Sequence, residues 1–176
     1  MNSAPPCSVR QVNSEGYAAD VSEASWDRSR CSVAGTLAVV GEKWSLLVLR
    51  EAFLGVRRFA DFQRHLGAPK AVLTDRLGTL VEQGILTRVP YQAEGERQRH
   101  EYRLTTKGID LYPTLVALMA WGDKYLSDEL APLELRHREC GEPVHLALVC
   151  DAGHELDGAR DVRPVPRASA VPAAGR

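Results

Sequence analysis

The chain has 176 residues, of which 44% are hydrophobic and 26% are charged, and its formal net charge is −1. This suffices for one domain of ordinary size with extensions, and a charge near zero argues against an indiscriminate polyanion binder of the histone-like kind. No apolar run is long enough to span a bilayer and no signal peptide precedes the first helix, so we expect a cytoplasmic protein without a membrane partner. Four cysteines then favour free thiols, metal ligands or redox sensors over structural disulfides.

Residues 1–30 show little periodicity and are predicted to form a disordered N-terminal arm. Two helices are expected next, over 33–40 and 44–54, the second of them strongly apolar. Cys31 directly precedes the first helix. Because helix N-termini stabilise thiolates, the form that reacts with oxidants and electrophiles, Cys31 is a candidate sensor. The alternative is a small apolar residue that only caps the helix.

Two further helices are predicted over 57–66 and 69–83, because Gly67 ends the first, Pro69 starts the second and Gly84 stops it. Apolar residues recur at helical spacing in the second helix and predict a buried stripe. This stripe consists of Val72, Leu73, Leu77, Leu80 and Val81. The opposite face is polar and carries Lys70, Thr74, Asp75, Gln83 and, near its edge, Arg76.

Residues 85–91 and 100–105 are predicted strands, and the polar, Gly-centred segment between them is typical of a hairpin tip. Two short helices followed by a basic β-ribbon are the order of a winged helix-turn-helix, whose second helix enters the major groove of DNA. Base edges should face Lys70, Ala71 and Thr74, and phosphates should face Arg57, Arg58 and Arg76. Arg97 and Arg99 on the wing should enter or flank the minor groove. The plainer alternative is that these charges only solvate helix faces.

Thr105 is placed to cap a long helix that reaches Leu126, and Pro113 within it predicts either a kink or a break. The apolar face of this helix is wider than one domain of this size needs. It either packs on the core near Trp44 and Leu47 or forms a symmetric dimer interface.

Residues 129–157 are predicted to form a small Cys/His module, and residues 158–176, rich in Ala, Pro, Val and Arg, a disordered tail. The pattern His-x2-Cys-x9-Cys-x3-His makes His137, Cys140, Cys150 and His154 candidate ligands of one structural Zn²⁺. A hairpin over 144–149 would bring the two halves together. A metal-free surface appendage is the favoured alternative.

From Cys31 to about Trp121 the chain resembles the HxlR family of bacterial winged-helix transcriptional regulators. The matching residues are Cys31, Gly41-Glu42-Lys43-Trp44, Leu46-Leu47-Val48-Leu49-Arg50, Gly55, Arg57-Arg58-Phe59, Leu73-Thr74-Asp75-Arg76-Leu77, Gly84-Ile85-Leu86, Arg88, Tyr91, Tyr102-Arg103-Leu104-Thr105, Gly108 and Trp121-Gly122.

The resemblance implies a mainly α fold with a β-hairpin wing (α+β), in which residues 31–128 bind DNA and dimerise through the long C-terminal helix. Some relatives sense oxidants or electrophiles through a cysteine at the position of Cys31, so an oxidant or a small molecule is a candidate effector. Some relatives with a similar extension carry Cys-x2-Cys in its second half, where this chain has Gly153 in place of the second cysteine. The extension therefore resembles a zinc-ribbon remnant.

The sequence thus predicts a regulator of transcription that binds double-stranded DNA as a homodimer on an inverted repeat. Repression is favoured over activation because a compact dimer on a promoter blocks polymerase without further contacts. One rival is a winged-helix module that binds protein, in which Lys70, Arg97 and Arg99 are dispensable. Another is a zinc-dependent enzyme using Glu139, Glu142 or Glu155 as its base. Because the usual phosphate-loop, nucleophile-elbow and zinc-protease motifs are missing from the sequence, no enzyme is expected.

Overall fold

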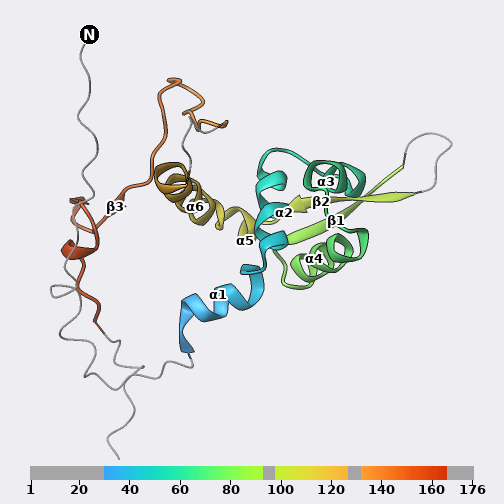
Figure 1. Cartoon of the computed structure of the whole chain (residues 1–176), viewed down its shortest axis with the longest axis horizontal. Coiled ribbons are helices and arrows are strands. Elements are labelled where there is room, and N and C mark those ends of the chain that lie inside the picture. The colour runs from blue at the N-terminus through green and yellow to red at the C-terminus, as the bar shows by residue number, and fades with distance from the viewer. Residues whose placement is uncertain (1–29, 93–97, 127–131, 166–176) are drawn as a thin grey trace, which may run out of the picture. The chain divides into compact units, whose positions relative to one another are not determined.

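The computed structural model describes residues 30–92, 98–126 and 132–165 (Figure 1). The chain divides into two compact units, one from Cys31 to Leu146 and a second whose described residues are 30 and 147–165. Each unit is described by itself. The arm predicted over 1–30 lies, apart from its last residue, outside the described residues.

Four helices open the first unit: α1 (Ser32–Val40), α2 (Lys43–Phe53), α3 (Phe59–Leu66) and α4 (Lys70–Glu82). They confirm the expected helices to within one or two residues at each end. The largest difference is at α3, which begins two residues later than predicted. The Arg57 carbonyl accepts a hydrogen bond of 2.8 Å from the Tyr102 amide, and Arg58 forms a bridge to Glu101, so this segment is extended.

The wing consists of β1 (Leu86–Tyr91) and β2 (Arg99–Leu104), which pair antiparallel with Leu86 opposite Leu104 and Tyr91 opposite Arg99. Figure 1 shows this hairpin extending away from α3 and α4. The hairpin tip over 93–97, and with it the predicted DNA contact Arg97, lies outside the described residues.

The hydrophobic core lies between α2, α3, α4 and the base of the wing. Its largest fully buried side chains include Leu49, Phe62 and Ile85. The stripe predicted on α4 is confirmed, since Leu73, Leu77 and Leu80 are fully buried, whereas Val72 and Val81 are partly buried. Burial of this stripe leaves the opposite face of α4 in solvent.

The long helix predicted after Thr105 is broken into α5 (Thr106–Ile109) and α6 (Tyr112–Tyr125). The cap at Thr105 is confirmed, because its Oγ1 accepts a hydrogen bond of 3.1 Å from the Gly108 amide. Pro113 is the second residue of α6. Proline has no N–H and clashes with the preceding turn, so it is accommodated in the first turn of a new helix rather than inside a continuous one.

Beyond α6, the first unit extends further than the predicted boundary at 128, because Leu133 and Leu135 pack over α2 and α6 and line a cavity with them. In the second unit, β3 (Leu148–Val149) pairs antiparallel with β4 (Glu155–Leu156), and the short helix η3 (Ala159–Asp161) follows. The tail predicted to be disordered from 158 therefore contains a helical turn, and its last residues, 166–176, lie outside the described ones.

Among the described residues, no single helix is long and apolar enough to cross a membrane. Taken together α1 and α2 would reach that length and composition, but they meet at a bend of 79°.

Candidate nucleic-acid interface

The first turns of α4 present the three residues that were predicted to face base edges. Lys70, Ala71 and Thr74 are all exposed, whereas Leu73 and Leu77 of the same helix are buried. Gly67, at φ 62°, closes α3 in the left-handed conformation and lets the chain turn sharply into α4. The buried stripe therefore determines which face of α4 a duplex can meet.

Arg76, predicted to contact phosphate, is less available than these three residues. Its side chain is 25% exposed and its Nη2 forms an ion pair with the neighbouring Asp75 carboxylate. Asp75 itself is 63% exposed. Because carboxylates accept hydrogen bonds from the cytosine amino group in the major groove, Asp75 is a candidate reading residue that our sequence analysis did not assign.

Arg57 and Arg58, also predicted to contact phosphate, lie where α3 meets the wing. Arg57 donates from Nη1 to the Ala52 carbonyl at 3.4 Å. The Arg58 guanidinium lies 4.5 Å from the centre of the Tyr91 ring, and its Nε is 3.5 Å from Oε1 of Glu101. The Arg58 side chain is still 55% exposed, so it can meet a phosphate without leaving the wing.

Glu101, opposite Val89 in the wing, contacts two arginines, and our sequence analysis did not single it out. Its Oε2 accepts a hydrogen bond of 3.1 Å from Arg103, and its Oε1 pairs with Arg58. The hydrogen bond from Arg103, with the Arg58 pair, holds the pKa of this carboxyl below its ordinary value. An ionised Glu101 therefore orients two arginines, Arg58 just before α3 and Arg103 on β2.

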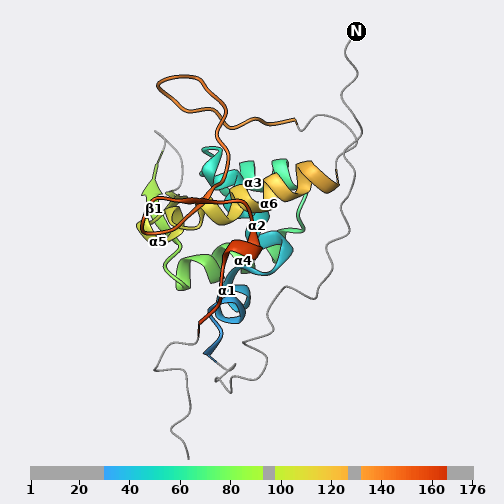
Figure 2. The same ribbon diagram turned by 90° about the vertical axis from the view of Figure 1, so that its left-hand side faces the viewer.

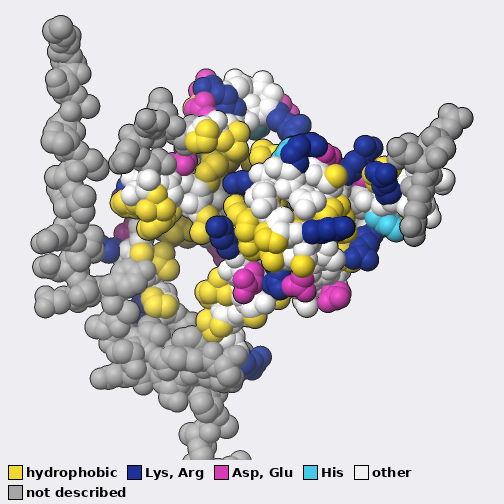
Figure 3. Space-filling model, turned by 45° about the vertical axis from the view of Figure 1, so that its right-hand side comes forward, with side chains coloured by type: hydrophobic (Ala, Val, Ile, Leu, Met, Phe, Trp, Pro, Cys, Tyr) yellow, Lys and Arg dark blue, Asp and Glu magenta, His cyan; other side chains and the backbone are white. Residues whose placement is uncertain are grey.

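Basic side chains gather where the wing leaves the domain, as the dark-blue surface in Figure 3 shows. Between the start of α3 and the wing lies an open groove of about 500 Å³, lined among others by Arg58, Phe59, Tyr91, Arg99 and His100. Arg99 is exposed at the first residue of β2. A groove beside the wing that is lined by two arginines is suited to a DNA backbone.

The buried carboxylate of Glu51 links α2 to α3. Glu51 is only 5% exposed, and its carboxylate lies 2.9 Å from Nδ1 of His65 and accepts hydrogen bonds from Nε and Nη2 of Arg50. Our sequence analysis missed this contact. The sequence signal that could have revealed this contact is an acidic residue three positions after Val48, on a mostly apolar face of the helix.

Cys31, the candidate sensor, is the N-cap residue of α1 and is partly buried. Its carbonyl accepts a hydrogen bond of 3.0 Å from the Gly35 amide. Within the described part of the chain, Cys31, Cys140 and Cys150 are free thiols. The helix start predicted next to Cys31 is therefore confirmed, whereas sensing stays a prediction.

The candidate zinc ligands form two pairs. Nδ1 of His137 lies 3.1 Å from Sγ of Cys140, and Nδ1 of His154 lies 3.5 Å from Sγ of Cys150. Nowhere in the ranges that the structure describes do three or more His, Cys, Asp or Glu side chains converge as metal ligands do. Because the two pairs belong to different compact units, the four-ligand site stays a prediction. Gly153, at φ 84°, occupies the turn between Cys150 and His154.

The exposed first turns of α4, the preceding α3 and the basic wing form a winged helix-turn-helix. The sequence profile of the HxlR-like helix-turn-helix family matches residues 39–130. The chain belongs to this family. The HTH-type transcriptional regulator Rv3095 of Mycobacterium tuberculosis (strain ATCC 25618 / H37Rv) is 51% identical to it over 136 residues, which cover 77% of this chain and 85% of that protein.

Solved structures agree with this assignment. The crystal structure of PA1607 is 40% identical to this HxlR-like protein, covers 80% of it and 97% of its own chain, and superposes with a TM-score of 0.70. The redox regulator HypR in its oxidized form is 31% identical, covers 55% of this chain and 99% of its own, and superposes with a TM-score of 0.50. This HxlR-like protein is accordingly a helix-turn-helix transcriptional regulator. The comparisons lend no support to the protein-binding rival, and a family of regulators implies a non-enzymatic role.

Proposed function

We propose that this HxlR-like regulator is a repressor that binds an inverted-repeat operator as a homodimer. In each half-site α4 would enter the major groove through Lys70, Ala71 and Thr74, with the wing beside it. The exposure of these three residues on the polar face of α4 carries this proposal. Arg58 and Arg99, which line the groove between α3 and the wing, would contact the flanking phosphates.

The dimer is supported by apolar surface that the first unit does not bury. α1 has the sequence Ser-Val-Ala-Gly-Thr-Leu-Ala-Val-Val, yet its residues 32–38 are all exposed. On α6, Leu118, Trp121 and Tyr125 are each at least half exposed. In Figure 1 both helices lie on the side of the unit away from the wing, and Figure 2 views that side, with α6 above α1.

A second copy of the chain is the occupant that best fits this surface. Contiguous exposed apolar patches on small domains mark interaction sites, and a two-fold dimer places two α4 helices one DNA turn apart. Electrophoretic mobility shift and footprinting on the DNA upstream of the protein's own gene test the whole proposal. We expect protection of two half-sites centred about 34–36 Å apart.

Sedimentation at micromolar concentration tests the dimer separately. Leu37→Glu and Trp121→Glu should give folded monomers that lose operator affinity, because both side chains lie on the exposed apolar surface. Gln83→Glu adds the same charge at an exposed position at the end of α4 and should leave a dimer. A wild-type monomer that protects a single half-site would contradict the proposal.

We further propose that Cys31 makes the repressor responsive to oxidants or electrophiles. Cys31 is the N-cap residue of α1, so a group added to its sulfur would disturb the start of a helix assigned to the dimer interface. The similarity to HypR, a redox regulator, supports this assignment. The physical route would run from the modified sulfur through α1 to the spacing of the two α4 helices.

A further inference from the structure

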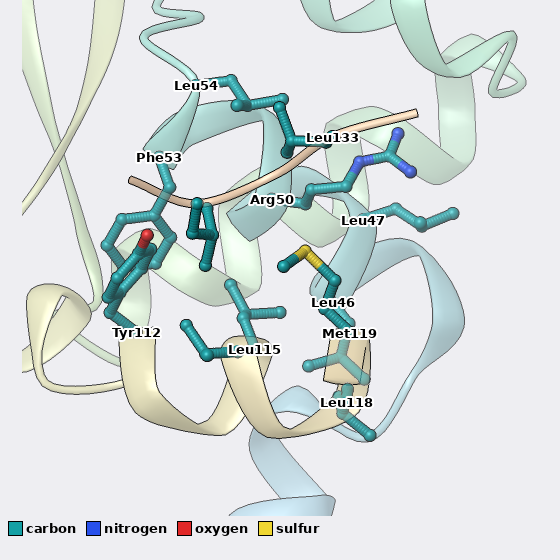
Figure 4. A pocket seen from close by; sticks show the side chains of 12 residues that line it. Leu46, Leu47, Arg50, Phe53, Leu54, Tyr112, Leu115, Leu118, Met119 and Leu133 are labelled. Carbon is teal, nitrogen blue, oxygen red and sulfur yellow. The ribbon is translucent and has the colours of Figure 1, made fainter. Parts of the chain in front are cut away.

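An apolar cavity of about 340 Å³ lies between α2, α6 and the segment around Leu133 (Figure 4). Its walls come from three stretches of the chain and include Leu46, Phe53, Leu115, Met119 and Leu133. The cavity is open to solvent, since Leu54, Leu118 and Leu133 on its walls are each more than 40% exposed. Cavities of roughly 300–1,000 Å³ with mostly apolar walls are typical of small-molecule sites.

Arg50 gives this cavity one polar edge. Among the described residues that line it, only Arg50 is charged, and its side chain is 50% exposed. In Figure 4 the Arg50 and Leu47 side chains extend to the same side. A ligand whose apolar body fills the space near Leu115 would therefore have its head group at that edge.

The guanidinium of Arg50 has donors left for such a head group. Its Nε and Nη2 donate to Oε1 of Glu51 at 3.0 and 2.7 Å. A guanidinium carries five N–H donors on three nitrogens, so this pair uses only part of its capacity. The planar fork matches the geometry of a carboxylate, which can accept two parallel hydrogen bonds from it.

Arg50 also connects the edge of the cavity to the DNA-binding helices. Glu51, to which it donates, is buried and lies 2.9 Å from Nδ1 of His65 in the last turn of α3. An anion bound by the remaining donors of Arg50 would weaken the pairing of Arg50 with Glu51 and so alter the contacts that hold α3 against α2.

We propose that this cavity binds an apolar monocarboxylate such as a medium-chain fatty acid, with the chain between Phe53 and Leu115 and the carboxylate on Arg50. Binding then acts on α3 through Glu51 and His65. This second step rests on the proposed operator binding, whereas the first step does not.

Calorimetric titration of the full-length protein with decanoate, and with 1-decanol as an uncharged molecule of equal length, tests the first step. We expect one decanoate per chain, bound about tenfold more tightly than decanol, as a charged hydrogen bond implies. Arg50→Gln should remove this preference. Leu115→Trp should fill the cavity and abolish binding of both molecules, and Met119→Trp provides a second filled variant if the first does not fold.

Lys43→Gln removes a charge from the exposed start of the same helix and should bind both molecules like wild type. Equal affinities for decanoate and decanol in the wild-type protein would overturn the proposal. So would unchanged decanoate binding in Arg50→Gln and in a folded Trp variant. Dissociation of a dimer by the Trp variants would instead assign the cavity to the contact between two copies, and would also overturn it.

Operator affinity with and without saturating decanoate tests the second step. We expect a change of about fivefold or more in wild type, the lower end of usual allosteric coupling, and a smaller change in His65→Gln. Unaltered operator affinity in a protein that binds both DNA and decanoate would overturn the coupling. If the protein binds no DNA, the proposed function fails while the calorimetric result stands by itself.

Discussion

Nδ1 of His65 lies 2.9 Å from Oε2 of Glu51, and this contact joins the last turn of α3 to the buried side of α2. Burial by itself raises the pKa of Glu51, but the hydrogen bonds from His65 and Arg50 outweigh it, and the pKa lies below its ordinary value of 4.5. A carboxyl with a depressed pKa in the folded state stabilises the fold fully above its unfolded pKa. That contribution is lost as the pH falls through the folded value.

Glu51→Gln should therefore lower the free energy of unfolding by about 1–3 kcal/mol at neutral pH, the usual cost of impairing a buried charged hydrogen bond. The difference from wild type should shrink when the pH falls below 4.5, the ordinary value for this carboxyl. Urea unfolding at neutral and acidic pH measures both effects. Asp61→Asn, which removes an exposed pair with Arg64, should cost less than about 1 kcal/mol. A loss of equal size at both pH values would contradict the assignment.

Two single substitutions should separate base reading from phosphate contact. Lys70→Ala should reduce the preference for the operator over a mutated site, with about 1–3 kcal/mol lost per base contact. Arg99→Ala should weaken binding to all sequences. It should also reduce, by about one, the slope of the logarithm of the binding constant against the logarithm of the salt concentration; the same prediction applies to Arg97. Fluorescence anisotropy at several salt concentrations measures both, with Lys107→Ala, whose Nζ donates to the Gln83 carbonyl, as the control. Unchanged affinity in both variants would exclude this docking.

Gly108 should tolerate no larger residue, because α5 packs closely on the start of the wing. A Cβ at this position would lie 2.3 Å from the Ile85 carbonyl oxygen. Gly108→Ala should cost about 1–3 kcal/mol of unfolding free energy, as overpacked sites do. Gly78→Ala in α4, where an added Cβ meets no described atom within 4 Å, should instead stabilise by about 0.5–1 kcal/mol. Urea unfolding that ranks the two variants equally would disprove this packing.

If Cys31 is the sensor, it should be the thiol that electrophiles modify first, ahead of Cys140 and Cys150. Cys31 is the N-cap residue of α1, and helix N-termini carry a partial positive charge. Mass spectrometry after limiting iodoacetamide compares the labelling of all four cysteines, and operator release by diamide compares wild type with Cys31→Ser. Equal release from both proteins would remove Cys31 from the mechanism.

If His137, Cys140, Cys150 and His154 are the ligands, the Cys/His segment should bind about one Zn²⁺ per chain, as a structural ion. Four protein ligands leave no open position for water, so no hydrolytic activity is expected. Metal analysis of protein purified without added zinc or a metal-chelating tag decides this. Substoichiometric zinc in wild type, or equal zinc in the Cys140→Ser, Cys150→Ser double variant, would identify the segment as a metal-free remnant.

The helices and strands of the winged helix could be predicted because their signals are local. Gly67 and Pro69 mark the turn between α3 and α4, and the spacing of Leu73, Leu77 and Leu80 already determines which face of α4 is buried. The face proposed to read DNA follows from that stripe, since the side opposite a buried stripe stays in solvent.

Tertiary structure decided what depends on partners distant in the chain. α3 starts at Phe59 because Tyr102, more than forty residues away, pairs with Arg57 and holds it extended. Pro113 allowed a kink or a break, and the separate start of α6 at Tyr112 was settled only by how the chain packs after α5. The cavity at Arg50 exists because Leu133 returns over α2 and α6. Helical periodicity records which side of a helix is apolar, but not which distant segment covers it or what space is left between them.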